Sequence, residues 1–121
     1  MKSIIDSNNY PLIPIELELD NLEFKKEAYV DTGATTYCVF VPESYFEFEK
    51  VKQNFFSVPI TTGDGTTHFW KAYTGKIKIG NKEFQSSIVV GTQKLILGRG
   101  ILDQLVSIFD GPNQKITLNE H

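Results

Sequence analysis

Short segments of alternating apolar and polar residues, separated by pairs of turn-forming residues, run along most of the 121 residues. Residues 15–19 read Ile-Glu-Leu-Glu-Leu, which is the period of a strand with one buried face. Residues 37–41 are apolar and rich in aromatic and β-branched types, which predicts a buried strand. Asp20-Asn21 and Gly80-Asn81 are typical turn pairs. The sequence therefore predicts a mostly β fold.

The predicted strands follow one another with short turns. They cover residues 12–19, 23–30, 37–41, two long stretches on either side of 62–66, 76–79, 84–90, 95–97, 108–109 and 116–118. Residues 62–66 read Thr-Gly-Asp-Gly-Thr, which predicts the tip of a hairpin. Because proline lacks a backbone N–H, Pro14 places the start of the first strand at a sheet edge or outside the ladder.

Two short stretches favour helix. Residues 42–49 begin with a proline, which suits the first turn of a helix. Residues 101–105 have apolar side chains at helical spacing. Phe46 and Phe48, in the first stretch, are expected to cover the core. We therefore predict a single mostly β domain over residues 1–121 with one or two short helices.

The composition narrows the class of protein. Hydrophobic residues make up 40% and charged residues 22% of the chain, which is typical of a globular domain. A net charge of −3 without any basic run excludes the electrostatic pattern of a nucleic-acid or anionic-membrane binder. No stretch approaches the roughly 20 apolar residues of a membrane span, and no secretory signal is visible. Since Cys38 is the single cysteine, an internal disulfide is excluded, and we expect a cytoplasmic protein.

The triplet Asp31-Thr32-Gly33 lies between two predicted strands. A loop in this position can aim a carboxylate into a cleft while its backbone is held by the strands. Thr32 offers a hydroxyl for tying the loop to another segment, and Gly33 allows close backbone approach. The alternative is an ordinary turn, because Asp and Gly are favoured turn residues. By composition the triplet arises by chance in about two of a hundred chains of this length.

Two further features follow the triplet in a fixed order. After Asp31-Thr32-Gly33-Ala34 come the glycine-tipped hairpin and then residues 95–102, an apolar strand, Gly98-Arg99 and a short helix. This order resembles the retropepsin-like aspartic protease family. Residues 96–118 also resemble the closing segment of pepsin-like lobes, so cellular and prokaryotic members with that ending are the closer match. The resemblance extends from Pro11 to Leu118.

The resemblance implies a fold, an assembly and a role for each matched residue. The fold would be a single-lobe acid-protease barrel with a flap hairpin, assembled as a two-fold homodimer. Asp31 would be the catalytic aspartate, Thr32 would bond across the dimer, Gly33 would present backbone to the substrate, and Ala34 would line the cleft. The flap would be formed by Thr62, Gly63, Asp64, Gly65 and Thr66. Leu97 and Gly98 would pack beneath the active-site loop, and Arg99 would tie the helix to its surroundings.

The chain departs from the retroviral pattern in three places. Gly100 stands where those members usually have Asp or Asn, and Thr35 stands where they often have an Asp that pairs with the arginine. Residues 108–118 add a hairpin beyond the helix, so the retroviral interface strands do not carry over. These departures motivate an alternative function, a non-catalytic protease-like dimerisation or peptide-binding module. A small β-barrel of unknown ligand is the generic reading.

The chemistry of the family requires two carboxylates about 3 Å apart that share one proton. The other aspartates lie in terminal, turn, flap or helix contexts, and none repeats the triplet: Asp6, Asp20, Asp64, Asp103 and Asp110. A homodimer that places each Asp31 beside its mate would supply the pair. The predicted activity is hydrolysis of peptide bonds in a polypeptide substrate, an aspartic-type endopeptidase with no cofactor.

Several other residues carry weaker alternatives. His68, His121 and Cys38 are too few for a zinc site, so no metal is predicted. A Cys38–His68 nucleophile pair is conceivable, but Cys38 lies in an apolar run and is expected in the core. His68 is expected to point outward from its strand. Phe69 and Trp70 would line the substrate cleft or pack at the flap root, and Asp64 is expected to be a turn residue.

Overall fold

The computed structural model describes the backbone of residues 4–5, 11–31, 39–61, 63–102, 105–110 and 115–120, and side chains within 12–31, 39–61 and 63–101. The predictions on Thr32, Gly33, Ala34, Thr35, Cys38, Thr62 and His121 lie outside these residues. The strands are β1 Ile4–Ile5, β2 Pro11–Leu19, β3 Leu22–Val30, β4 Val39–Val41, β5 Phe56–Thr61, β6 Thr67–Ile79, β7 Lys82–Val90, β8 Ile96–Leu97, β9 Leu105–Asp110 and β10 Lys115–Glu120. Two 3-10 turns, η1 Glu43–Tyr45 and η2 Phe48–Lys50, and one short helix, α1 Arg99–Leu102, complete the described structure. The predicted mostly β fold is confirmed.

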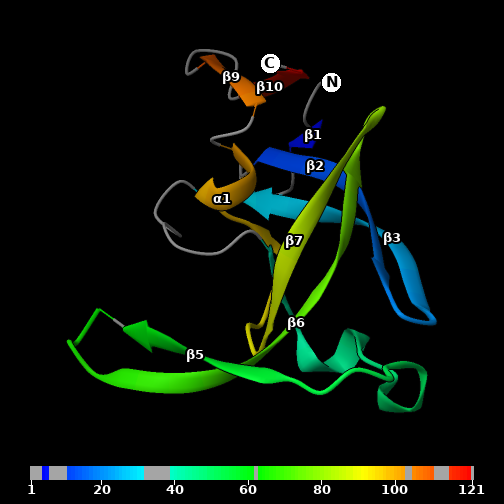
Figure 1. Ribbon diagram of the computed structural model, residues 1–121. Helices are drawn as coiled ribbons and strands as arrows, with labels where there is room; N and C mark the ends of the chain where they lie inside the picture. The colour runs from blue at the N-terminus through cyan, green and yellow to red at the C-terminus, as the bar shows by residue number, and fades with distance from the viewer. Residues whose placement is uncertain are drawn as a thin grey trace.

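Six strands close into a barrel. Their order is β2-β3-β8-β4-β7-β6, and the pairing of β6 with β2 closes the ring. The pairs β3–β8 and β4–β7 are parallel, whereas the other barrel pairs are antiparallel. β5 pairs with β6 outside the closed ring, and Figure 1 shows these two strands projecting as a long hairpin.

Alternation of inward and outward side chains along the strands builds the core of the barrel. In β2 the side chains of Ile13, Ile15, Leu17 and Leu19 are buried. β6 repeats the pattern, with Ile77 and Ile79 buried and Lys76 and Lys78, which precede them, exposed. Because each buried Ile or Leu contributes about 1.5–3 kcal/mol, this inward row is a main source of stability.

A glycine allows β2 and β6 to approach each other. A Cβ placed on Gly75 would lie 2.7 Å from the carbonyl oxygen of Glu18 and 2.5 Å from Cδ1 of Ile88. Backbone on one side and a core side chain on the other leave no room for any substituent. Gly75 is therefore required where the barrel closes.

Two local predictions need correction. Pro14 lies inside β2, paired with Glu27, so of the two predicted places, a sheet edge or outside the ladder, the second is wrong. It is tolerated there because β1 pairs with residues 11–12 and β6 with residues 16–18, so the described pairings leave the second edge of β2 open at Pro14. Leu105 begins β9 and does not belong to the helix, because the helix ends at Leu102.

The stretch after β4 was also predicted only in part. The predicted helix over residues 42–49 is replaced by the two 3-10 turns, with Pro42 at the N-cap of η1. Phe46 is buried and packs against Tyr73 with ring centroids 5.6 Å apart. Phe48, which was expected to cover the core with Phe46, is 47% exposed. Phe48 begins η2, a turn that has no buried residue.

The C-terminal strands stand apart from the barrel sheet. β9 and β10 pair with each other in a separate two-stranded sheet, in register from Leu105↔Glu120 to Asp110↔Lys115. In Figure 1 this sheet lies beyond α1, at the end of the barrel opposite the long hairpin. Among the described residues, no helix is long and apolar enough to cross a membrane.

Candidate active site

Asp31 lies where the chain leaves the barrel after β3. Its backbone N–H donates to the carbonyl oxygen of Leu97 at 3.1 Å, and Tyr29 N–H donates to that of Leu95 at 2.9 Å. On the other edge of β8, Leu97 is the partner of Val39, where the chain re-enters the sheet. The two ends of the segment that carries the triplet are therefore both held against Leu97.

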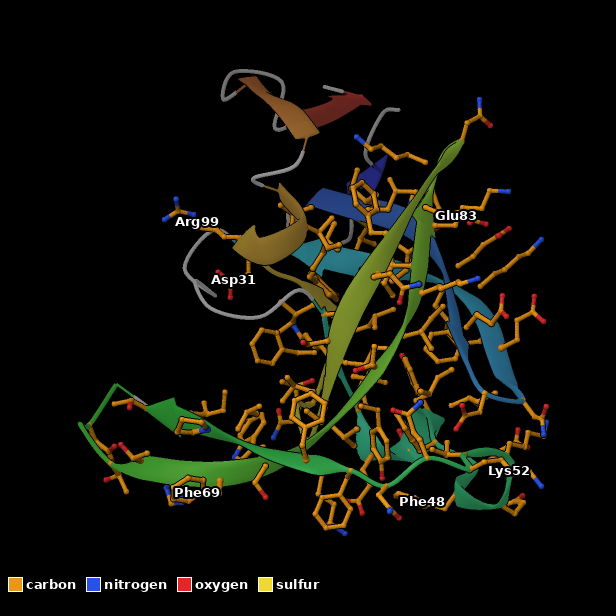
Figure 2. All side chains as sticks on the ribbon, in the orientation of Figure 1. Asp31, Phe48, Lys52, Phe69, Glu83 and Arg99 are labelled. Carbon is orange, nitrogen blue, oxygen red and sulfur yellow. The ribbon has the colours of Figure 1, made fainter. Side chains whose placement is uncertain are left out.

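The residues after Leu97 anchor the helix next to this point. Leu97 and Ile101 are fully buried in the main core. Gly98 is also buried, and its carbonyl oxygen accepts the N–H of Ile101 at 3.2 Å, which opens α1. Leu97 thus contacts the start of the Asp31 segment, whereas the loop itself lies outside the described residues. Arg99 is exposed at the start of α1, and Figure 2 labels it near Asp31 in the view; its role stays a prediction.

Asp31 directly follows the end of β3, and its side chain is exposed. Val30 packs against the main core, so its neighbour in the strand, Tyr29, points outward. The register places Tyr29 beside Ile96, Ile96 beside Phe40, and Phe40 beside Val89. These four outward residues, Tyr29, Ile96, Phe40 and Val89, form a row that we call the outer strip. Asp31 stands one strand repeat beyond this row.

The hairpin covers part of the apolar outer strip. Phe40 and Val89 form a second cluster with Val58 and Ala72, and Ile60, Trp70 and Ile96 pack against it. We call β5, residues 67–72 of β6 and the tip between them the arm. One face of the arm root therefore rests on the outer strip.

Trp70 fixes the contact between the arm root and β7. A Cβ on Gly91 would lie 3.3 Å from Cε3 of the Trp70 ring, and Gly91 has a φ of +140°. The indole is thus packed on a bare stretch of backbone, and half-buried. Of the two roles expected for Trp70, packing at the root is what the structure shows.

The arm and Asp31 lie at different heights along the outer wall. Trp70 pairs with Val58 on β5. It lies two residues before Ala72, which pairs with Val89 of the outer strip. Asp31 lies two residues beyond Tyr29 in the other direction. At about 3.3 Å per residue, the rows of Trp70 and Asp31 are separated by about 13 Å, with the outer strip between them. In Figure 2 Asp31 is labelled on the side of the barrel toward which the arm extends.

The tip of the arm is open to solvent. Gly63, Asp64, Gly65 and Thr66 are exposed. The N–H of Thr66 donates to Oδ1 of Asp64 at 2.9 Å, so Asp64 is a turn residue as predicted. Gly65 has a φ of +84°, and a Cβ on it would meet nothing within 4 Å. The predicted hairpin is confirmed, whereas its action as a flap stays a prediction.

His68 and Phe69 are both exposed beside the arm root. Phe69 is 73% exposed and His68, as predicted, also points outward. Phe69, Phe48 and Tyr73 contribute to a shallow hollow of ≈ 340 Å³ between the root and η2. Phe69 thus does not pack at the root.

The outer strip was not predicted from the sequence. Phe40 lies in an all-apolar run. Because such a run is apolar on both faces, its composition does not show which residues face outward. The signal was present in the period of two, which places Phe40 opposite Val39 and Val41. Tyr29 and Ile96 could be found only from the parallel pairing of β3 with β8.

Comparisons with known proteins add no assignment. No family model matches the chain, and no curated protein matches it. Within the part of the chain that the structure describes, no group of three or more His, Cys, Asp or Glu side chains could hold a metal ion. Functional inference therefore depends on the sequence motifs and on the geometry around Asp31.

Proposed function

We propose that the protein is an aspartic endopeptidase of the retropepsin-like type, active as a two-fold homodimer with Asp31 as the catalytic carboxylate of each subunit. The observation that carries the proposal is the position of Asp31: its segment is held to Leu97 on both sides, and the exposed Asp31 follows Tyr29, the end of the apolar outer strip, by two residues. A rigid frame of this kind suits a carboxylate that must meet a second one at short range.

The proposed reaction uses two Asp31 carboxylates that share one proton. The ionised carboxylate takes a proton from water while the water oxygen attacks the peptide carbonyl carbon. The protonated carboxylate hydrogen-bonds to the carbonyl oxygen, which becomes the oxyanion of a tetrahedral intermediate. The protonated carboxyl group then gives its proton to the amide nitrogen, the oxyanion re-forms a carbonyl, and the C–N bond breaks, which leaves the pair with the one proton taken from water. Because protons leave the pair in coupled steps, we expect a bell-shaped dependence of rate on pH.

A second copy is needed because one chain supplies one suitable aspartate. Of the other described aspartates, Asp20 lies in the β2–β3 turn, Asp64 in the arm tip and Asp110 at the end of β9. The separate β9–β10 sheet is where we expect the copies to meet. A two-stranded sheet is marginally stable in isolation, and pairing with another copy would extend it.

The part of the outer strip that the arm root leaves accessible supports a substrate class for this proposal. Phe40 and Val89 are buried, whereas Tyr29 and Ile96 are half-buried and carry no charge, so apolar residues on either side of the cleaved bond would be favoured. An extended polypeptide would bind by backbone hydrogen bonds along the arm, as in strand addition. The arm would then act as a flap that covers the peptide.

The test is cleavage of fluorescein-labelled casein between about pH 3 and 8, with wild type beside Asp31→Asn. Glu83→Gln, which removes an exposed carboxylate from the outer face of β7, is the matched control. We expect a bell-shaped profile, a rate that rises faster than linearly with enzyme at low concentration, and loss of at least about 10³-fold in Asp31→Asn alone. Activity that survives in Asp31→Asn would refute the assignment. A folded wild-type dimer that binds casein without cutting it would instead favour the non-catalytic peptide-binding module.

A further inference from the structure

The turn between β2 and β3 is tied to the segment that leads into the arm. Oδ2 of Asp20 accepts the backbone N–H groups of Lys52 at 2.6 Å and Gln53 at 2.9 Å, across 32 and 33 positions of sequence. Beside it, Asn21 N–H donates to the carbonyl oxygen of Lys50 at 3.1 Å. One short turn thus holds three backbone groups of a remote segment.

The side chain of Gln53 continues this connection to β6. Its Oε1 accepts the N–H of Thr74 at 2.9 Å, and its Nε2 donates to the carbonyl oxygen of Thr74 at 3.0 Å and to Oδ1 of Asp20 at 3.3 Å. The β5–β6 ladder begins at Phe56↔Ala72, so Thr74 lies just beyond it. The amide of Gln53 therefore acts in place of strand backbone and extends the ladder at the arm root.

The charge of Asp20 strengthens these bonds. The N–H of Gln53, and after it that of Lys52, lowers the pKa of the Asp20 carboxyl below its ordinary value of 3.8. The residue also has a φ of +53°, a conformation in which Asp and Asn are the best tolerated side chains after glycine. Both the side chain and the backbone shape at this position thus serve the connection.

The connection and the second cluster act on the same root. Val58, Ala72 and Trp70 hold one face of the root on the outer strip, and Asp20 and Gln53 hold the segment that enters β5. A change in either attachment would alter the angle at which the arm leaves the barrel. Trp70 belongs to this root and packs on Gly91, so a change in the angle of the arm would alter the surroundings of its ring.

We propose that Asp20 and Gln53 form a latch that sets the position of the arm, and that they are thereby positioning residues for a polypeptide bound beneath it. The second part rests on the proposed protease function. Neither residue belongs to the outer strip or to the Asp31 segment, so the latch would act through the arm alone.

The first test uses Trp70, the one tryptophan of the chain, as a reporter that does not depend on activity. Asp20→Asn keeps the turn, since Asn accepts the same φ, but removes the charge; Gln53→Ala removes the bonds to Thr74. Glu18→Gln on β2 and Gln85→Ala on β7, both exposed, are the matched controls. We expect a red shift of Trp70 emission and greater quenching by acrylamide in both latch variants, and no change in the controls. The double variant should exceed the larger single effect only slightly, because the two residues belong to one network.

The second test measures cleavage of labelled casein by the same variants, with far-UV circular dichroism to confirm folding. We expect KM to rise about three- to tenfold while kcat stays within about twofold, as loss of binding geometry without loss of chemistry predicts. Unchanged Trp70 emission in both latch variants would overturn the latch. A shifted emission with unchanged KM and kcat would overturn the positioning role. If wild type cleaves nothing, the proposed function fails, and Trp70 emission by itself still decides whether the latch sets the arm.

Discussion

β6 belongs to both the barrel and the arm, and its two halves differ in whether a core covers one of their faces. In the barrel half of β6, Gly75, Ile77 and Ile79 alternate in burial with exposed residues between them. In the arm half, Thr67, His68 and Phe69 are all exposed. The backbone is paired on both halves, so pairing does not separate them. The difference teaches that a closed core stabilises the barrel, whereas the arm depends on a few contacts at its root.

The largest expected difference between the two regions concerns buried aliphatic side chains. Leu17→Ala empties a site that is 0% exposed and should lower the free energy of unfolding by about 2–5 kcal/mol. Ile60→Ala, at a half-buried site of the arm, should cost about 1 kcal/mol or less. Urea unfolding followed by circular dichroism measures both. Equal costs would mean that the arm is as tightly packed as the barrel.

Glycines give the next largest contrast. Gly75→Ala drives a methyl group against the Glu18 carbonyl and the Ile88 side chain, and should lower the free energy of unfolding by about 1–3 kcal/mol. Gly63→Ala, where nothing lies within 4 Å, should change it by less than about 0.5 kcal/mol. Urea unfolding followed by circular dichroism measures both changes in the free energy of unfolding. A mild effect at Gly75 would show that β2 and β6 can separate without cost.

A third variant acts on the joint between the two regions. Gly91→Ala combines an unfavourable φ with a Cβ 3.3 Å from the Trp70 ring, so we expect about 1 kcal/mol of destabilisation together with altered Trp70 emission. Gly65→Ala on the arm tip, with a φ of +84° and open space around it, shares the strain and should leave the emission unchanged. If both variants shift the emission, backbone strain rather than contact with Trp70 is the cause.

The smallest expected effect is the pH dependence of the latch. The Asp20 carboxyl has a pKa lowered below 3.8 by the N–H groups of Gln53 and Lys52, so its ionised form is favoured by folding. Its contribution is complete well above pH 3.8 and is lost as the pH falls through the lower pKa of the folded state. The difference in Tm between wild type and Asp20→Asn should therefore be constant at neutral pH and shrink in acid. A difference that persists unchanged below the folded-state pKa would show that the charge of Asp20 is irrelevant.

Much of this molecule could be predicted from local pattern. The alternation in residues 15–19 and 76–79, the turn pairs and the Gly63-Asp64-Gly65 tip led to strands and a hairpin that the structure confirms. The errors lie where local pattern is ambiguous: Leu105 fits a helical spacing and begins a strand, and Phe48 is apolar yet exposed. The N–H of Asp31 donates to the carbonyl oxygen of Leu97, whereas the predicted packing of Leu97 and Gly98 beneath the active-site loop stays a prediction.

The sequence by itself determined which residues alternate, where the chain turns and which carboxylate stands between strands, because these properties depend on neighbours a few positions apart. Tertiary structure alone decided that β6 closes on β2 at Gly75, that Ile96 and Leu97 lie between β3 and β4, and that Asp20 holds a segment 32 positions away. Such pairings depend on which distant surfaces fit together once the core is buried, and a period of two residues cannot express that choice.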